Sequence, residues 1–251
     1  MNNLESVLQT ALDTVKETYD IITNDALAGE VSVKGDADFV TQVDFKVQSF
    51  IKSRLYSEFP EIQFMGEEGE RDKIDFSKLV WILDPVDGTT HLIRRYGMSA
   101  VSLALAENGN PILGIIYNPF HNELYTAVKG GGAFFNVRRI YVSETADIKD
   151  ALVSIGTMPY DKSNADKSFD VYKKLFLNCI DIRRLGSAAL DLAYTARGSC
   201  DAYFEPRLKP WDFAAGGVLG EEAGGTVTDF NGNAVRVDKI SDIAASNKRL
   251  H

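Results

Sequence analysis

Residues 80–90 read Val-Trp-Ile-Leu-Asp-Pro-Val-Asp-Gly-Thr-Thr, an apolar run that stops at two aspartates, a glycine and two threonines. The first four residues are apolar without alternation, which is typical of a strand covered on both faces. Pro85 cannot donate a ladder hydrogen bond and biases Asp84 away from helical geometry, so we expect the strand to end at Asp84. The pattern predicts a buried strand that carries charged side chains at its C-terminal end.

The residues after this strand are suited to a cation and a phosphate. Asp84 and Asp87 flank a tight turn, where both carboxylates can converge on one cation. The segment Gly88-Thr89-Thr90 offers flexible backbone and consecutive N–H groups, which suit a phosphate oxygen, above all where they open a helix. Taken alone, the segment is equally well explained as an Asp-rich surface turn.

Three further acids lie at predicted element boundaries. Glu67 follows an apolar stretch, and Asp44 begins an amphipathic helix that we expect to run to about Tyr56. Asp212 lies in the first turn of a helix that Pro210 can open. Each acid alone is explained by a solvated loop or a helix cap. One carboxylate cage explains them all, because Mg²⁺ prefers oxygen ligands and is commonly shared between carboxylates, water and phosphate.

Segments that match one known family occur in family order along nearly the whole chain. They are Asp38-Phe-Val-Thr-Gln-Val-Asp44, Gly66-Glu67-Glu68, Trp81-Ile-Leu-Asp84-Pro-Val-Asp87-Gly-Thr-Thr90, Gly186-Ser-Ala-Ala189, and Trp211-Asp212-x-x-Ala-Gly with Glu222-Ala-Gly-Gly225. The chain resembles the inositol monophosphatase family, within the lithium-sensitive, Mg²⁺-dependent phosphatase superfamily. The resemblance implies a layered αβαβα sandwich, inhibition by Li⁺ and, commonly, a homodimer.

The resemblance also implies a set of metal ligands for two or three Mg²⁺ ions. Glu67, Asp84 and the Val86 carbonyl resemble the ligands of the first ion, and Asp84, Asp87 and Asp212 resemble those of the second. A third, weaker ion involves the glutamate that matches Glu67, together with waters. For catalysis, the resemblance implies this same glutamate and a pair of residues that orients and deprotonates the attacking water, Thr89 and Asp44.

The substrate-binding residues implied by the resemblance surround the same turn. They are Asp87, Gly88, Thr89 and Thr90 at the phosphate, and Gly186, Ala188 and Glu205 at the sugar or inositol hydroxyls. Glu205 ends an apolar strand seven residues before Asp212, so it should face the same cleft. The alternative is that Glu205 is an ion-pair partner of Arg207 or Lys209.

Three details call for separate interpretation. His91 stands where the family commonly has asparagine, and we interpret it as a packing or hydrogen-bonding residue rather than a base. Asn136 is followed by Val137 where the family often has glycine, which weakens the tight hairpin turn predicted there. The triplet at 130–132 lacks the lysine and helix of a phosphate loop, so we interpret it as a turn or bulge between strands.

Hydrophobic periodicity predicts the remaining elements. It indicates a single long helix over residues 3–28 and an antiparallel meander between residues 99 and 135, with Asn-Gly and Gly-rich turns. Strand and helix then alternate, with strands at 151–155, 181–183, 202–204, 226–228 and 243–245 and helices at 168–177, 187–196 and 211–223. We expect one phosphatase domain with an α+β half (about 1–147), an α/β half (about 148–251) and the active site between them.

Composition limits the class of protein. With 251 residues, 45% of them hydrophobic, the chain can bury a large core. A formal net charge of -9 without a basic run disfavours a nucleic-acid binder. Cys179 and Cys200 are interpreted as core residues or free thiols. Neither a signal peptide nor an apolar run of the roughly 20 residues that span a bilayer is visible, so we expect a cytoplasmic protein without membrane partners.

The sequence leaves three functions open. The first is Mg²⁺-dependent hydrolysis of inositol monophosphate or a similar small sugar or polyol phosphate. The second applies the same chemistry to fructose 1,6-bisphosphate, a nucleotide 3′-phosphate or histidinol phosphate; relatives that act on the last two often carry Lys or Arg where Thr90 stands. The third is a non-catalytic regulatory protein on the same fold, which would be expected to lose the cage acids first.

Overall fold

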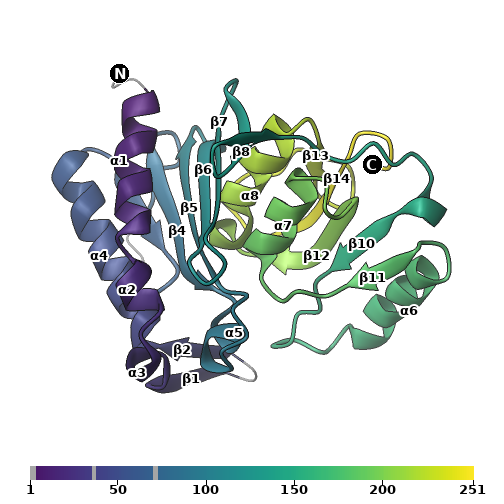
Figure 1. Ribbon diagram of the computed structural model, residues 1–251, viewed down its shortest axis with the longest axis horizontal. Coiled ribbons are helices and arrows are strands. Elements are labelled where there is room, and N and C mark those ends of the chain that lie inside the picture. The colour runs from purple at the N-terminus through teal and green to yellow at the C-terminus, as the bar shows by residue number, and fades with distance from the viewer. Residues whose placement is uncertain (1–3, 36–37, 70–72) are drawn as a thin grey trace.

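The computed structural model describes residues 4–35, 38–69 and 73–251, and its elements form five layers (Figure 1). An outer layer of helices covers a seven-stranded sheet, a central pair of helices separates this sheet from a five-stranded one, and a last helix covers the far side. The layered αβαβα sandwich expected from the sequence is confirmed.

The N-terminal region forms three helices instead of the single helix predicted over residues 3–28. Residue 3 of this prediction lies outside the described residues. The three helices are α1 (Leu4–Lys16), α2 (Tyr19–Ile22) and α3 (Asp25–Ala28). Threonine and asparagine side chains compete with the helical ladder at the two breaks. The Thr18 hydroxyl donates to the Val15 carbonyl, and the Asn24 side chain accepts from two backbone N–H groups and caps α3. The apolar period alone did not indicate these breaks.

A short hairpin leads into the second helix of this layer. The hairpin pairs β1 (Val31–Gly35) with β2 (Asp38–Thr41), and α4 (Gln42–Glu58) follows directly. Thr41 and Asp44 form a capping box at the start of α4. The Asp44 carboxylate accepts from the Thr41 N–H, and the Thr41 hydroxyl accepts from the Val43 N–H. Asp44 is therefore the third residue of this helix, which begins two residues earlier than the sequence predicts.

The large sheet has the strand order β3-β4-β5-β6-β7-β8-β9. Its strands are β3 (Gln63–Gly66), β4 (Val80–Asp87), β5 (Ala100–Glu107), β6 (Asn110–Asn118), β7 (Glu123–Val128), β8 (Gly132–Phe135) and β9 (Arg138–Ile140). Consecutive pairs from β4 onward are antiparallel, which confirms the predicted meander. Asn108 and Gly109 both have positive φ, as a two-residue hairpin turn requires.

Strand β4 continues past Asp84, so the prediction that it ends there is wrong. Its pairing with β5 runs from Asp84 opposite Ser102 to Asp87 opposite Ala100, so one extra residue is accommodated on β4. Pro85 lies inside this bulge, where its missing N–H leaves no ladder bond unmade. The bulge sets the relative positions of the two aspartates.

Two turns at the far edge of the sheet depend on local side chains. The loop of Asn136 and Val137 still joins β8 to β9 as a two-residue hairpin, with positive φ at Asn136 alone. Glu222 accepts hydrogen bonds from the N–H groups of Gly130 (2.7 Å) and Gly132 (2.8 Å). The glycine triplet is therefore a turn between β7 and β8, as predicted, and a distant carboxylate holds it.

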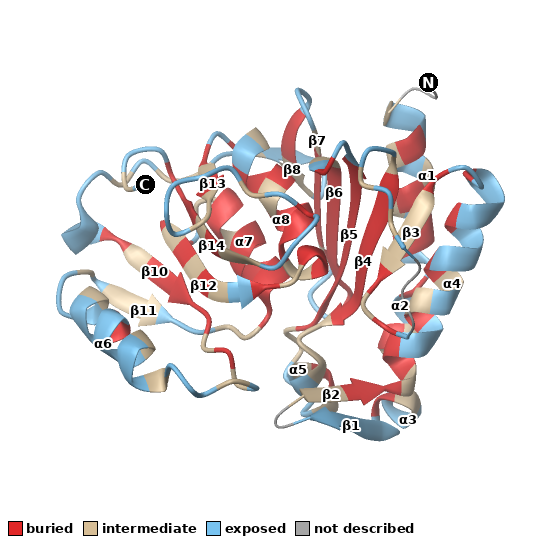
Figure 2. Cartoon of the chain, turned by 180° about the vertical axis from the view of Figure 1, so that it is seen from behind, coloured by how far each residue is buried: buried red, intermediate tan, exposed pale blue. Residues whose placement is uncertain are grey.

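The central helices are α7 (Ala188–Ala196) and α8 (Pro210–Glu222), buried on almost every side (Figure 2). Such burial explains why α8 is apolar around its circumference. Gly114 of β6 lies so close to α8 that a Cβ on it would stand 2.5 Å from the Ala215 carbonyl oxygen. This close approach joins the second half of the chain to the first sheet.

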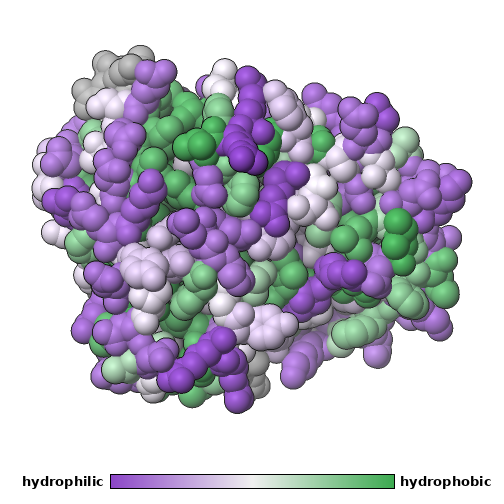
Figure 3. Space-filling model, in the orientation of Figure 1, coloured by the Kyte–Doolittle hydropathy of each residue, from purple (hydrophilic) through white to green (hydrophobic). Residues whose placement is uncertain are grey.

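The second sheet has the order β11-β10-β12-β14-β13. Its strands are β10 (Leu152–Ile155), β11 (Asp181–Arg183), β12 (Ala202–Leu208), β13 (Thr226–Thr228) and β14 (Ser241–Ser246); a 3₁₀ turn, η1 (Ile148–Asp150), precedes them and α6 (Ala165–Phe176) covers the outer side. Each predicted strand and helix of this half is present, with ends that differ by a few residues. Phe169, Phe176 and Leu177 remain more than half exposed, and apolar atoms are visible at this end of the molecule in Figure 3.

Both cysteines are free thiols, as the sequence indicates, with Cys200 buried and Cys179 half-buried. Within residues 4–35, 38–69 and 73–251, we find no helix of the length and apolarity needed to traverse a bilayer.

Candidate active site

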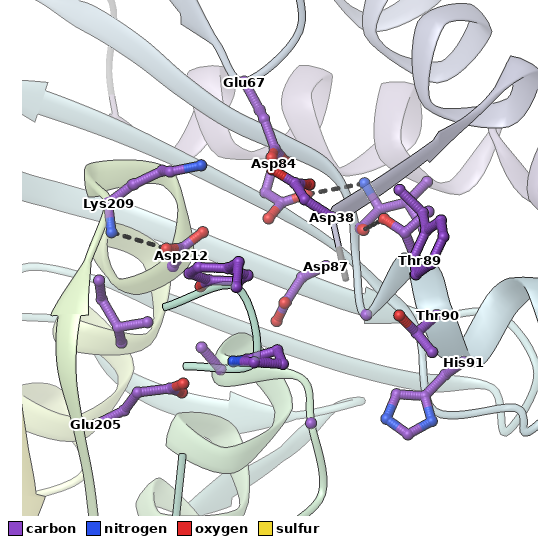
Figure 4. Close-up of a pocket in the computed structure, with 18 of the residues that line it drawn as sticks. Asp38, Glu67, Asp84, Asp87, Thr89, Thr90, His91, Glu205, Lys209 and Asp212 are labelled. Carbon is purple, nitrogen blue, oxygen red and sulfur yellow. Dashed lines mark hydrogen bonds between the residues drawn. The ribbon is translucent and has the colours of Figure 1, made fainter. Parts of the chain in front are cut away.

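The predicted site residues meet at a cavity of ≈ 310 Å³ between the two sheets (Figure 4). With the exception of Asp44, all of them line it: Glu67, Asp84, Val86, Asp87, Gly88, Thr89, Thr90, Gly186, Ala188, Glu205 and Asp212. The acids come from the residue after β3, the bulge of β4, the middle of β12 and the first turn of α8. Residues more than 100 positions apart in sequence thus share one cavity. Glu205 does not end its strand, although the sequence predicts that it does, because pairing with β14 continues to Leu208 past an irregularity in the register.

Each of the two aspartates of the β4 bulge is held in place by hydrogen bonds to one of its carboxylate oxygens. Asp84 Oδ1 accepts from the Val86 N–H at 2.9 Å, so this carboxylate is fixed by its own turn. Asp87 Oδ2 accepts from the Ser187 hydroxyl at 2.7 Å and from the Ala189 N–H at 2.6 Å. Asp87 therefore also binds the first turn of α7, a contact that the sequence did not predict.

The third aspartate is positioned by the helix on which it lies. Asp212 Oδ2 accepts from the Lys209 N–H at 2.7 Å, which completes the first turn of α8. The Trp211 carbonyl accepts from Ser102 Oγ at 3.1 Å, which ties this turn to β5. The capping role considered for Asp212 is real, and it leaves the other oxygen of the carboxylate available for a ligand.

Glu67 lies beside a lysine that the sequence did not single out. Lys34 of β1 forms an ion pair with Glu68 and lies 3.8 Å from Glu67 Oε1. Burial, together with the charge of Glu68, raises the pKa of Glu67 to about 7, although Lys34 acts in the opposite direction. No motif relates residues 34 and 67, so this contact depends on the fold.

Like charges crowd this cavity. Burial and the charges of the neighbouring carboxylates raise the pKa of Asp84 and of Asp212 well above the usual range, and burial raises the pKa of Asp87 to about 6. Among the described residues, no three acidic, histidine or cysteine side chains are arranged to hold a metal ion as they stand. The donors are nevertheless all hard oxygens, and their mutual repulsion is relieved by a divalent cation such as Mg²⁺. The residues fit this ion chemically.

A stability measurement tests this crowding. Because the folded-state pKa values of Glu67, Asp87 and their neighbours are raised, the folded chain binds more protons than the unfolded chain between about pH 4 and pH 7. The free energy of unfolding therefore falls as pH rises through this window. We expect the Tm of the chelator-treated protein to drop by several degrees between about pH 5 and pH 7.5, and Mg²⁺ to raise it more at the higher pH.

The isosteric variant Asp212→Asn is the comparison for this measurement. It keeps the oxygen that accepts from Lys209 but removes one charge, so its Tm should depend less on pH than that of the wild type. Equal pH dependence of the two proteins would contradict repulsion within the cavity.

Thr89 begins a short helix beside the acids. Gly88 adopts left-handed φ of 89° and starts α5 (Thr89–Ile93), whose first N–H groups have no intrahelical acceptor. Thr89 Oγ1 lies 3.2 Å from Asp44 Oδ1 and 3.1 Å from the Val86 carbonyl. Asp44 is buried, and its second oxygen accepts from the N–H and the hydroxyl of Thr41. The hydroxyl and carboxylate proposed to act on water are therefore in contact.

Glu205 faces the cavity and not the basic residues near it in sequence. Its Oε2 accepts from the Tyr203 hydroxyl at 2.6 Å, and burial raises its pKa. Arg207 pairs instead with Asp161 at 3.1 Å. No ion pair within 4 Å joins Glu205 to Arg207 or Lys209 in the described part of the chain, so the alternative interpretation of Glu205 is wrong.

Several cavity residues were not identified from the sequence. Lys209, Arg184 and Tyr160 also line the cavity, and no local pattern marks them. His91 also lines the cavity, with its ring 5.0 Å from that of Tyr96. Burial, followed by the charge of Arg184, lowers the pKa of His91, which agrees with a packing role.

Comparisons with known proteins agree with this geometry. A family model described as the inositol monophosphatase family matches residues 3–251. A Nus factor SuhB from Salmonella typhimurium is 42% identical over 89% of this chain and 83% of its own. An inositol-1-monophosphatase from Rhizobium meliloti is 41% identical over 81% of this chain and 76% of its own. The crystal structure of the extragenic suppressor protein suhB from Bartonella henselae has a TM-score of 0.91 and 36% identity, covering 98% of this chain and 95% of that one.

Proposed function

The chain belongs to the inositol monophosphatase family, and we propose that it is a Mg²⁺-dependent phosphomonoesterase that hydrolyses inositol monophosphate or a similar small sugar or polyol phosphate. The observation that carries the proposal is the meeting of Glu67, Asp84, Asp87 and Asp212 in one cavity with the Thr89–Asp44 pair. Bound Mg²⁺ would supply charge stabilisation for the phosphate and would increase the acidity of water. Its ligands would be those four acids and the carbonyl of residue 86.

The chain's own residues orient the reactants. Thr89 donates its hydroxyl proton toward Asp44, so the lone pairs of Oγ1 can accept a hydrogen bond from the attacking water. Asp44 is the acceptor to which the water's proton passes through this hydroxyl. Thr41 keeps the carboxylate in place. The N–H groups at the start of α5 are placed to bind phosphate oxygens.

The substrate end of the cavity is formed by Gly186, Ala188 and Glu205. The Glu205 carboxylate can accept hydrogen bonds from the hydroxyls of a polyol, and its charge repels a second phosphate group. These features favour a monophosphorylated polyol over a bisphosphate, and leave fructose 1,6-bisphosphate, nucleotide 3′-phosphates and histidinol phosphate as the less favoured alternatives.

The proposal is tested by measuring phosphate release. Purified protein is assayed against a panel of small phosphomonoesters with Mg²⁺ and again after exhaustive chelation. Mg²⁺-dependent release from inositol 1-phosphate is the expected result. Hydrolysis that survives chelation, or a clear preference for adenosine or fructose bisphosphate, would contradict the proposal as stated.

Glu205→Gln tests the assignment of substrate. We expect this variant to lower kcat/KM for inositol 1-phosphate by roughly tenfold, because an amide accepts polyol hydroxyls less strongly than a carboxylate does. Hydrolysis of p-nitrophenyl phosphate, which lacks those hydroxyls, should change little. Equal losses on both substrates would assign Glu205 a structural role.

A regulatory role is the second candidate, because a relative at 42% identity is named a Nus factor. The Asp212→Asn allele separates the two functions in the source organism, because an asparagine can keep the hydrogen bond from the Lys209 N–H and removes only the charge. Full rescue of a deletion phenotype by this allele would indicate that catalysis is dispensable there. Failure of the allele to rescue, at normal protein level, would support the phosphatase.

We further propose that the protein is a cytoplasmic homodimer. The exposed apolar residues of α6 and its end, Phe169, Phe176 and Leu177, are available for contacts of this kind. Light scattering coupled to size-exclusion chromatography measures the oligomeric state directly.

A further inference from the structure

One wall of the cavity is aromatic and has no part in the chemistry described above. Tyr160 and Pro159 line the cavity beside the substrate end. The Tyr160 side chain remains 44% exposed. Asp212, Glu205 and Asp87 line the same cavity. A large ring therefore borders the space that a bound polyol would fill.

The loop that carries Tyr160 is fixed at its first end. The Gly156 N–H donates to the Phe204 carbonyl at 3.0 Å, and the Gly156 carbonyl accepts from the Tyr172 hydroxyl at 2.5 Å. A Cβ on Gly156 would overlap the carboxylate of Glu205, so the loop leaves β10 in direct contact with this acid. The loop and Glu205 are thus positioned together.

The other end of the loop is held by a charged contact. Asp161 accepts from the hydroxyl and the N–H of Ser163, and its second oxygen pairs with Arg207 at 3.1 Å. Between the two ends, Met158 adopts φ of 43° and buries its side chain, so the chain reverses sharply there. Tyr160 is consequently displayed at the cavity from a segment anchored on both sides.

We propose that Tyr160 is a specificity-determining residue, which packs its ring against the apolar face of a cyclic polyol or sugar and makes the site prefer ring-shaped phosphomonoesters over acyclic ones. The proposal rests on the phosphatase function proposed above and deepens it. A cyclitol or pyranose has hydroxyls around its edge and C–H groups on its faces. Glu205 accepts the edge hydroxyls, and an aromatic side chain covers a face at small cost in conformational entropy.

An acyclic polyol phosphate such as glycerol 2-phosphate lacks such a face. It can still place its phosphate at α5 and a hydroxyl at Glu205. The contribution of Tyr160 is therefore read in the ratio of kcat/KM values for inositol 1-phosphate and glycerol 2-phosphate, not in overall activity.

Kinetics of three variants test the proposal. Tyr160→Ala should raise KM for inositol 1-phosphate about tenfold, equivalent to about 1.4 kcal/mol, while kcat/KM for glycerol 2-phosphate stays within about twofold. Tyr160→Phe should keep the preference, since the ring makes the contact. Tyr141→Ala, which removes a 61% exposed tyrosine away from the cavity, is the control and should change neither substrate.

The anchor of the loop provides an independent test. Arg207→Ala removes the ion pair with Asp161 and should reduce the cyclic preference in the same direction, but less than Tyr160→Ala. Arg236→Ala removes a comparable pair with Asp238, distant from the cavity, and should leave the preference unchanged. Equal effects of the two arginine variants would count against a positioned loop.

Three results would overturn the proposal: equal losses on both substrates in Tyr160→Ala, no loss on either, or a loss in Tyr160→Phe as large as in Tyr160→Ala. Binding of the two compounds, read as a Tm shift in the Mg²⁺-loaded protein, separates this proposal from the proposed function. A wild type that hydrolyses neither compound refutes the phosphatase. Even then, the role of the ring is supported if the wild type binds inositol 1-phosphate more tightly than glycerol 2-phosphate and Tyr160→Ala abolishes this difference. If the wild type shows no such difference in binding, the role of the ring is refuted.

Discussion

Asp212→Asn is expected to lower kcat for inositol 1-phosphate by roughly two to three orders of magnitude, the usual loss when one group that stabilises transition-state charge is removed. The substitution preserves shape, and the amide oxygen can still accept from the Lys209 N–H that Asp212 Oδ2 now binds. What the variant loses is one negative charge in the cavity. Because that charge would be needed only to hold the cation, catalysis should suffer and folding should not. Steady-state kinetics with saturating Mg²⁺ measure the effect.

A stability measurement and a matched control variant decide how a loss of activity in Asp212→Asn is interpreted. Removing a charge from a crowded group of acids should leave the cation-free protein at least as stable as the wild type near pH 7.5, so low activity with an unchanged or higher Tm indicates a site effect. Asp147→Asn makes the same change at another carboxylate that accepts from a backbone N–H, but outside the cavity. It should retain full activity. Near-normal turnover by Asp212→Asn would refute its role as a metal ligand.

Asp87→Asn should give a loss of similar size for an additional reason. Asp87 accepts from both Ser187 and the Ala189 N–H, so its carboxylate also holds α7 against the β4 bulge. An asparagine that turns its NH₂ group toward these donors would disturb this contact. Comparison of Asp212→Asn with Asp87→Asn therefore separates the loss of a metal ligand from the loss of the contact between α7 and the β4 bulge.

The sequence predicted most of the fold because its signals are local and strong. The meander from β5 to β8 follows from apolar runs separated by turn residues, and α8 follows from Pro210 and the apolar residues after it. The predicted site residues came from motifs at element ends and from the family resemblance that these motifs carry, and the structure brings all of them except Asp44 to one cavity. Errors arose where hydrogen bonds of single side chains override a period, as at Thr18 and Asn24.

The contacts that were missed depend on long-range geometry. Lys34 of β1 pairs with Glu68, which follows β3, and the loop that carries Tyr160 is held by the pair of Arg207 and Asp161 across 46 positions. Pro85 shows the same limit at short range. Its effect on Asp84 was predicted as the end of a strand, whereas pairing with β5 continues around a bulge that only the neighbouring strand reveals. No periodicity or motif in one segment encodes such contacts.

Thr89→Ala is expected to lower kcat by about two to four orders of magnitude and to change KM only slightly. If the hydroxyl orients and deprotonates the attacking water, it acts mainly in the transition state, so its loss should appear in kcat. Substrate contacts through the N–H groups at the start of α5 do not involve the hydroxyl and should persist. Michaelis parameters for inositol 1-phosphate at saturating Mg²⁺ give both quantities.

Thr89 Oγ1 also lies 3.1 Å from the Val86 carbonyl, so a structural role must be separated from a catalytic one. Thr89→Ser keeps the hydroxyl and should retain most of the activity. Asp44→Asn removes the proton acceptor while its other oxygen can still bind Thr41, so it should lower kcat as Thr89→Ala does. Combining the two changes should cost little more than either alone, because both residues act on one proton. An unchanged kcat in Thr89→Ala, or fully additive losses in the double variant, would show that the water is activated without this pair.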